Sequence, residues 1–202
     1  TGEERRRQIL DTMLRMAGEQ GPDAVTTKAL AARIGVTEPA LYRHFPAGKP
    51  EMWRALATVL GERMQMAWRA ALGETESAPA RLRQLVAAQL QLIAAIPALP
   101  AILFSRTLHQ GNAALRAGMA EVAGRFHARL EHILADGQRA GEIDPDVDPD
   151  AAAWLLISVI QGTAIRWSLS ERAFDLEREG LRILDAALRG VEASHQARGS
   201  AR

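Results

Sequence analysis

The side chains with the clearest capacity for chemistry lie between positions 27 and 49, where hydroxyl, phenol and basic groups recur at helical spacing. Thr27 stands at a predicted helix start, where its hydroxyl and the free backbone N–H groups can bind a phosphate. Arg43 can bond guanine O6 and N7, and Glu38 can accept from cytosine N4. The residue types predict a surface for duplex DNA, made of Thr27, Lys28, Thr37, Glu38, Pro39, Ala40, Tyr42, Arg43, His44 and Lys49.

Two short predicted helices would position this surface. Helical signals begin at Thr26 or Thr27 and end at Ile34, and a second set covers residues 38–45. The turn between them contains Gly35, as is common in a helix-turn-helix, and Thr37 is a suitable N-cap for the second helix. The sequence therefore predicts a helix-turn-helix within the first fifty residues.

The second of these helices is expected to have a buried face and an exposed face. Leu41 and Phe45 are i, i+4 neighbours and can pack on the first helix, through Leu30, Ala31, Ile34 and Val36. The opposite face then presents Glu38, Pro39, Tyr42 and Arg43. One exposed helix with polar side chains fits the major groove of DNA.

An ordinary helical bundle is the competing interpretation of this segment. Thr-capped short helices occur in Ala-rich bundles by chance, and Tyr42, Arg43 and His44 could be plain surface. Charge favours DNA modestly, because residues 1–50 hold eight Lys and Arg against six Asp and Glu, whereas the rest of the chain is slightly acidic. The agreement of turn, caps, buried face and polar face favours a DNA-binding module.

The remainder of the chain predicts helices and no strand. A small three-helix module joined to a bundle of about six helices is expected, with domains at 1–48, for DNA, and 49–193, for effector binding and dimerisation. Residues 194–202 are expected to be disordered. The predicted helices are Glu3–Gln20, the two above, and then Pro50–Leu72, Arg81–Ile96, Ala101–His109, Ala113–Ala140, Pro149–Leu169 and Asp175–Val191.

Composition limits the remaining classes of protein. The 202 residues include no cysteine, so disulfides and thiolate sites are absent. No leader and no apolar run of membrane-spanning length is evident, since the longest such run, 151–160, is about half a span. A cytoplasmic, nucleoid-associated protein with no membrane partner is expected.

The helix-turn-helix segment resembles the TetR family of transcriptional regulators. The resemblance rests on residues 26–31 (Thr-Thr-Lys-Ala-Leu-Ala), Gly35-Val36 and residues 40–45 (Ala-Leu-Tyr-Arg-His-Phe), with Arg7-Gln8-Ile9-Leu10 and Gly21 upstream. The resemblance implies an all-α homodimer that binds a palindromic operator, with a variable C-terminal domain that usually binds a small effector and then releases the DNA.

The resemblance also implies roles for individual residues. Thr27, Lys28, Pro39, Tyr42 and Lys49 match phosphate or base contacts of the family, whereas Glu38 and Arg43 match positions that vary with the operator. The chain departs from many members at Pro46-Ala47-Gly48, which places one extra residue before Lys49.

The C-terminal bundle predicts a dimer interface and an effector pocket. The helix at 151–169 is apolar nearly all round, so a second subunit is expected to cover it together with the last helix. The expected interface residues are Ile160, Trp167, Leu181, Leu184 and Leu188. The expected pocket between the middle helices is lined by Trp68, Phe104, His109, Phe126, Trp154 and Gln161.

No metal site and no cofactor are predicted. The alternating Asp144, Asp146, Asp148 and Asp150 lack the Glu that a calcium loop requires, and His127 and His132 are not spaced for one helix face. A ligand-responsive repressor is the leading prediction. The alternatives are a nucleoid-occlusion factor of the same family, whose sequence the run 41–46 also resembles, and a helical carrier or enzyme, which no catalytic motif supports.

Overall fold

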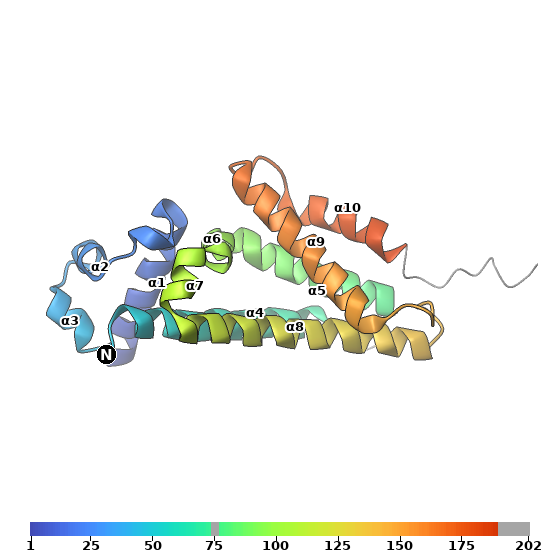
Figure 1. Ribbon diagram of the computed structural model, residues 1–202, viewed down its shortest axis with the longest axis horizontal. Coiled ribbons are helices and arrows are strands. Elements are labelled where there is room, and N and C mark those ends of the chain that lie inside the picture. The colour runs from blue at the N-terminus through green and yellow to red at the C-terminus, as the bar shows by residue number, and fades with distance from the viewer. Residues whose placement is uncertain (74–76, 190–202) are drawn as a thin grey trace, which may run out of the picture. The chain divides into compact units, whose positions relative to one another are not determined.

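The computed structural model describes residues 1–73 and 77–189, and all the regular structure within these ranges is helical (Figure 1). Ten α-helices and one 3-10 helix follow one another along the two ranges, with no strand between them. The all-α prediction is therefore confirmed. The tail predicted to be disordered, residues 194–202, lies outside the described residues.

The chain forms two compact units, and helices α4 and α8 each supply residues to both. Unit 1 comprises residues 1–65 and 95–122, and unit 2 comprises residues 66–94 and those from 123 onward. The domain boundary predicted after residue 48 marks the end of the helix-turn-helix segment, whereas the compact unit that contains this segment extends further along the chain.

Unit 1 is built around α1, which packs against α2, α6 and the 3-10 helix η1. Its elements are α1 (Gly2–Gln20), η1 (Pro22–Ala24), α2 (Thr27–Ile34), α3 (Glu38–Tyr42), the first part of α4 (Lys49–Ala71), α6 (Ala98–Phe104), α7 (Arg106–Gly111) and the start of α8 (Ala113–Arg139). The largest fully buried side chains include Ile9, Met13, Leu30, Leu41, Phe45 and Trp53. This core holds α2 and α3.

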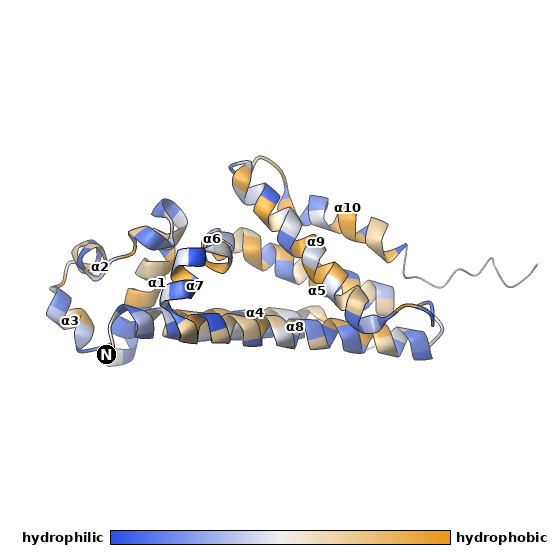
Figure 2. Ribbon diagram, viewed as in Figure 1, coloured by the Kyte–Doolittle hydropathy of each residue, from blue (hydrophilic) through white to orange (hydrophobic). Residues whose placement is uncertain are grey.

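Unit 2 contains the end of α4, α5 (Ala78–Ala95), the rest of α8, α9 (Pro149–Leu169) and α10 (Leu176–Leu188). Helix α10 packs against α9 and buries an apolar stripe that includes Leu184 and Leu188, while its other side is polar (Figure 2). The predicted cap at Asp148 is confirmed, because its side chain accepts a hydrogen bond from the Asp150 backbone N–H at 3.1 Å.

Two helix boundaries differ from the sequence prediction for local reasons. Helix α3 ends at Tyr42 rather than at Phe45, because the backbone turns just after it and Phe45 points into the core. The single helix predicted at 101–109 is two helices, α6 and α7. Ser105 has an extended backbone there, and its hydroxyl caps α7 by accepting from the Leu108 N–H at 3.1 Å.

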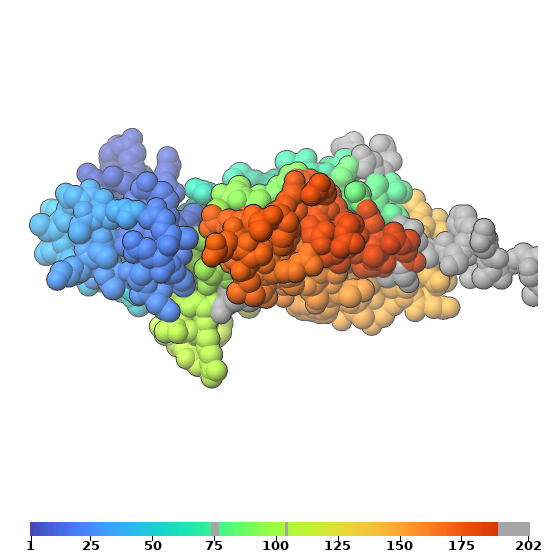
Figure 3. All heavy atoms as spheres, turned by 90° about the horizontal axis from the view of Figure 1, so that it is seen from above, coloured from blue at the N-terminus to red at the C-terminus, as the bar shows by residue number. Residues whose placement is uncertain are grey.

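Helix α9 is both long and apolar. By length and composition it is the one helix of the described ranges that could cross a membrane, with a mean hydropathy of 1.2. Buried core helices of water-soluble proteins meet the same criteria, and 44% of this window is buried. The end of α9 and the beginning of α10 lie on the face shown in Figure 3.

Candidate nucleic-acid interface

The turn between α2 and α3 has the geometry of a helix-turn-helix. The Thr26 hydroxyl caps α2 by accepting from the Ala29 N–H at 3.1 Å. Gly35 ends the helix with φ 79° and ψ 35°, a left-handed conformation that glycine adopts without strain. Its N–H and that of Val36 both bond the Ala31 carbonyl at 3.0 Å. Helix α3 therefore starts from a fixed turn, next to α2 (Figure 1).

Helix α3 buries one face and exposes the other. Leu41 and Phe45 are fully buried, as the i, i+4 pattern predicts. Exposed on the other side are Thr37, Pro39, Tyr42 and Arg43, with Tyr42 45% exposed, while Glu38, Ala40 and His44 are half-buried. The exposed groups thus include the aromatic Tyr42 of α3 and the cationic Arg43, which is the residue directly after the helix.

Thr27 and Glu38 contact each other directly. The Thr27 hydroxyl donates a hydrogen bond to Glu38 Oε2 at 2.8 Å, which joins the first turn of α2 to the first turn of α3. The sequence assigned these two residues to separate DNA groups and did not anticipate their bond. Lys28, beside Thr27, is exposed.

The loop after α3 places Tyr42 beside Gly48. Gly48 has φ 66°, and a Cβ at this position would lie 3.1 Å from Tyr42 Cε1. The Tyr42 ring therefore lies against the loop that contains the extra residue. Lys49 follows as the first residue of α4 and is half-buried.

A cluster around Arg6 fixes the end of α3, and sequence reasoning missed it. The Arg6 guanidinium lies 4.1 Å from the centre of the Phe45 ring, donates to the His44 carbonyl and pairs with Glu51 at 3.8 Å. Glu51 also accepts from the Ala47 N–H at 2.9 Å. The Arg6 cluster (Arg6, His44, Phe45, Ala47 and Glu51) joins α1, the loop after α3 and α4. Its members lie up to 45 positions apart, so no local spacing reveals it.

The residues predicted to line an effector pocket fall into two groups. In unit 2, Trp68 and Phe126 are buried with ring centres 4.8 Å apart, and Trp68 Nε1 donates to Gln89 Oε1 at 2.8 Å. Trp154 and Gln161 are exposed on α9. The structure therefore brings Trp68 and Phe126 together and places Trp154 and Gln161 at the surface of the same unit.

The other two predicted pocket residues belong to unit 1. His109 Nε2 lies 2.9 Å from the Leu103 carbonyl, while its Nδ1 is buried without a hydrogen-bond partner among the described residues. Phe104 is the last residue of α6, and its side chain lies outside the described part. A surface hollow of about 400 Å³ in unit 1 is lined by none of the predicted residues but by Glu4, Arg7, Gln8, Asp11, Thr12 and Arg15.

The residues predicted for a dimer interface are mostly core residues of unit 2. Ile160, Trp167, Leu184 and Leu188 are buried within one chain, and Leu181 is half-buried. They pack α9 on α10, so they have little surface left for a partner. The apolar side chains that α9 does expose are Trp154, Leu155, Ile165 and Leu169, which is 80% exposed.

The fold and the turn geometry define a helix-turn-helix DNA-binding protein, and comparisons with known proteins give its family. Residues 9–56 match the bacterial regulatory proteins of the tetR family, and residues 60–188 match the C-terminal region of YsiA-like proteins. The chain belongs to the TetR family and is a DNA-binding transcriptional regulator, as its sequence predicts.

Individual relatives agree with this family. The chain is 32% identical to the nucleoid occlusion factor SlmA of Marinobacter nauticus over 74% of each chain. It has the fold of a transcriptional regulator from Saccharomonospora viridis in complex with choline (TM-score 0.81, 22% identity, 95% of this chain and 100% of that one). It also has the fold of the regulator FadR from Bacillus subtilis in complex with stearoyl-CoA (TM-score 0.77, 23% identity, 91% and 98%).

Proposed function

We propose that this protein is a repressor that binds a palindromic operator as a homodimer and releases it when a small molecule binds. The observation that carries the DNA half of the proposal is the outward face of α3, where Pro39, Tyr42 and Arg43 are exposed while Leu41 and Phe45 anchor the helix in the core. Such a helix can enter the major groove with its N-terminal residues at the base edges.

Within this proposal the predicted contacts divide into two kinds. Thr27, Lys28, Tyr42, His44 and Lys49 bind backbone phosphates, while the exposed residues of α3 contact bases. Arg43 contacts a guanine. Glu38 reads a cytosine only if it exchanges its bond to the Thr27 hydroxyl for one to the base, and the freed hydroxyl then binds phosphate.

A dimer is proposed because a palindromic site needs two reading helices related by two-fold symmetry. The exposed apolar side chains of α9 supply the surface for it. Four large apolar groups on one helix are costly to leave in water, and a second copy of the same helix would cover them.

Release by a small molecule is supported by the interior of the C-terminal bundle and by the relatives. In unit 2, Trp68 and Phe126 form an aromatic cluster beside the Trp68–Gln89 hydrogen bond. Regulators of this fold have been solved with choline and with stearoyl-CoA, which are therefore the first two probes.

The experiment that tests this proposal measures release of DNA. A duplex enriched from a random pool is labelled, and binding of the purified chain is followed by fluorescence anisotropy while stearoyl-CoA or choline is added. Release of the duplex at ligand concentrations that also raise the melting temperature supports the repressor. Duplex affinity unchanged by either probe, with no thermal shift, counts against release by these two chemical classes.

A second candidate is a nucleoid-occlusion role, which the identity to SlmA proteins favours. DNA binding would then promote capture of a protein partner rather than respond to a metabolite. Protein captured from a cell extract only in the presence of the selected duplex would favour this role. In either case the protein is expected to act on the nucleoid in the cytoplasm, without a membrane partner and without enzymatic activity.

A further inference from the structure

Helix α8 and the start of α9 bring together three side chains of the kinds that bind metal ions. His127 and Glu131 are i, i+4 neighbours on α8, and Asp150 stands in the first turn of α9. One ligand atom from each lies within 4.8 Å of the others. The prediction of no metal considered His127 only with His132, because the sequence does not show that α9 returns to α8.

Asp150 and Glu131 both lie near the His127 ring but face different ring nitrogens, and the first pair has the spacing of two ligands of one ion. His127 Nε2 is 3.2 Å from Asp150 Oδ1, and His127 Nδ1 is 3.9 Å from Glu131 Oε2. Two ligands of a divalent first-row ion are about 3.0–3.5 Å apart, because each bond is about 2.0–2.2 Å long. The His127–Asp150 pair already has this spacing. Glu131 faces Nδ1, so its carboxylate has to turn toward Nε2 to join the same ion, and its side chain is 46% exposed.

The imidazole is held in place before any ion binds. Its side chain is 11% exposed, and the Trp154 ring packs on it with centres 4.5 Å apart and 32° between the planes. The two carboxylates are half-exposed or more, so water or a further ligand can complete the coordination shell. A fixed nitrogen with two adjustable oxygens is a favourable arrangement for binding.

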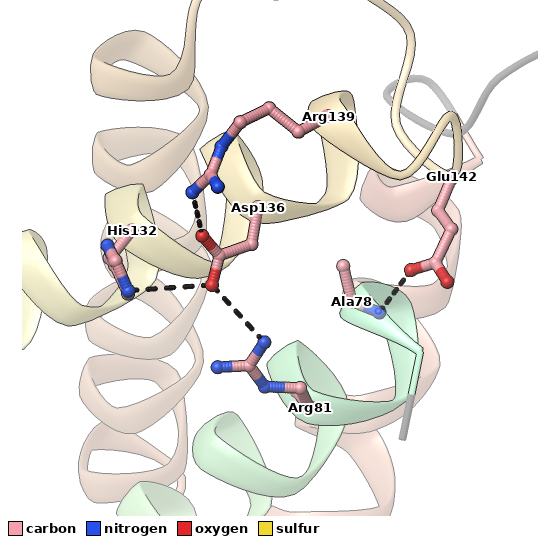
Figure 4. A network of polar contacts seen from close by, with 6 residues as sticks. All are labelled: Ala78, Arg81, His132, Asp136, Arg139 and Glu142. Atoms are coloured by element: carbon pink, nitrogen blue, oxygen red, sulfur yellow. Dashed lines mark hydrogen bonds and ion pairs between the residues drawn. The ribbon is translucent and has the colours of Figure 1, made fainter. Parts of the chain in front are cut away.

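A second histidine on α8 provides an internal comparison (Figure 4). His132 has the same i, i+4 relation to a carboxylate, since its Nε2 lies 3.5 Å from Asp136 Oδ2. Arg81 and Arg139 also pair with Asp136, which neutralises the carboxylate with two guanidinium groups. The described contacts of His127 are instead with the Glu131 and Asp150 carboxylates, the Asp150 backbone carbonyl at 3.4 Å and the Trp154 ring, and none of them is with a guanidinium. Similar spacing therefore gives a cation-attracting site at His127 and an internally paired site at His132.

We propose that His127, Glu131 and Asp150 bind a divalent transition-metal ion, with Zn²⁺ as the reference ion. One imidazole nitrogen and two carboxylate oxygens form a borderline set that suits Zn²⁺, Co²⁺, Ni²⁺ or Mn²⁺ better than Ca²⁺ or Mg²⁺. The bound ion joins α8 to the first turn of α9, both within unit 2. The site is separate from the proposed DNA and effector functions and does not depend on them.

The test uses the untagged, full-length chain freed of metal by chelation. Titration calorimetry with ZnCl₂ should give one site per chain, and Co²⁺ should give visible d–d absorption bands. His127→Ala should weaken Zn²⁺ binding by about 100-fold or more and abolish the Co²⁺ bands, because a ligand is lost. Asp150→Asn and Glu131→Gln should weaken binding in the same direction.

His132→Ala is the matched control and should bind Zn²⁺ as the parent protein does. If His127→Ala does not fold, Zn²⁺ binding is measured instead with the Glu131→Gln/Asp150→Asn double variant, which changes only exposed groups. This variant should then show the loss of Zn²⁺ affinity. The proposal is overturned if the parent protein shows no saturable Zn²⁺ binding, or if His132→Ala loses as much affinity as His127→Ala. In the first outcome the three residues form only an ion-paired cluster.

Discussion

The helix-turn-helix of unit 1 and helix α9 of unit 2 both expose side chains that a single chain leaves without cover, but of opposite character. On α3 the exposed groups are polar or cationic, such as Tyr42 and Arg43, and buried neighbours fix the helix beneath them. On α9 the exposed groups are apolar, such as Leu155 and Leu169. The difference indicates a polar, charged partner for unit 1 and an apolar partner for unit 2.

The arginines of the molecule make polar contacts of two kinds. In unit 1 the Arg6 cluster uses a cation to hold the end of α3 in position. In both units other ion pairs only join charged side chains to one another, as Arg33 does with Glu19 in unit 1 and Glu179 with Arg166 and Arg182 in unit 2. Contacts of the first kind should affect DNA binding, whereas contacts of the second kind should affect only stability.

The largest expected effect comes from the anchor of α3. Phe45→Ala should reduce the free energy of unfolding by about 3–5 kcal/mol, because it leaves a cavity and removes the ring beneath Arg6. Chemical denaturation measures the loss, and DNA affinity should fall with it. Phe174→Ala is the control, since Phe174 is half-buried in unit 2 with Arg166 5.0 Å from its ring. If Phe174→Ala lowers the free energy of unfolding and the DNA affinity as much as Phe45→Ala does, Phe45 is not a specific anchor of α3.

The apolar face of α9 should control assembly. Leu169→Asp should weaken dimerisation at least about tenfold while leaving the free energy of unfolding of the monomer nearly unchanged, because the side chain is 80% exposed in one chain. Sedimentation velocity across a concentration series gives the dissociation constant. Ser168→Asp, an exposed neighbour, is the control for added charge. If Leu169→Asp dimerises with the same dissociation constant as the parent protein, the dimer interface does not include this face of α9.

A smaller effect is expected at Arg6, which acts through α3. Arg6→Ala should cost about 1–3 kcal/mol of stability, from the lost ring contact and the lost bond to the His44 carbonyl. Affinity should fall for all duplexes alike, with no change in base preference. Arg5→Ala removes an exposed arginine of the same helix, whose side chain bonds only Gln8 in the described contacts, and is the control. A selective loss at one base pair would instead make Arg6 a base contact.

The smallest effect concerns acid stability in unit 2. Hydrogen bonds from Arg182 and Arg166 lower the pKa of Glu179 from 4.5 to about 2. A lowered carboxyl pKa stabilises the fold above pH 4.5, and this contribution is lost as the pH falls toward 2. Glu179→Gln should therefore lower Tm slightly at pH 7 and show a shallower decline between pH 4.5 and 2. Glu177→Gln, whose parent side chain bonds Gln91, should keep the parent's decline.

The sequence was most informative where function depends on local spacing. The turn at Gly35, the cap at Thr26 and the burial of Leu41 and Phe45 all follow from neighbours within a few positions, so the helix-turn-helix could be predicted. The Arg6 cluster and the His127–Asp150 pair join residues far apart in the chain, and only the packing of helices brings them together. The dimer interface stays a prediction, and its choice of residues has a related limit: periodicity shows that Ile160 and Trp167 are apolar, but not that both are already buried within one chain.

The most direct test of DNA reading by α3 is selection of bound duplexes from a random pool, with the parent protein and with Arg43→Ala, over a series of salt concentrations. The parent should select a palindrome and lose affinity steeply as salt increases. Arg43→Ala should relax the preference at one base pair per half-site, worth about 1–3 kcal/mol, while Tyr42→Phe weakens all sequences alike. An unchanged motif after Arg43→Ala, or no palindrome with the parent protein, would contradict base reading by α3.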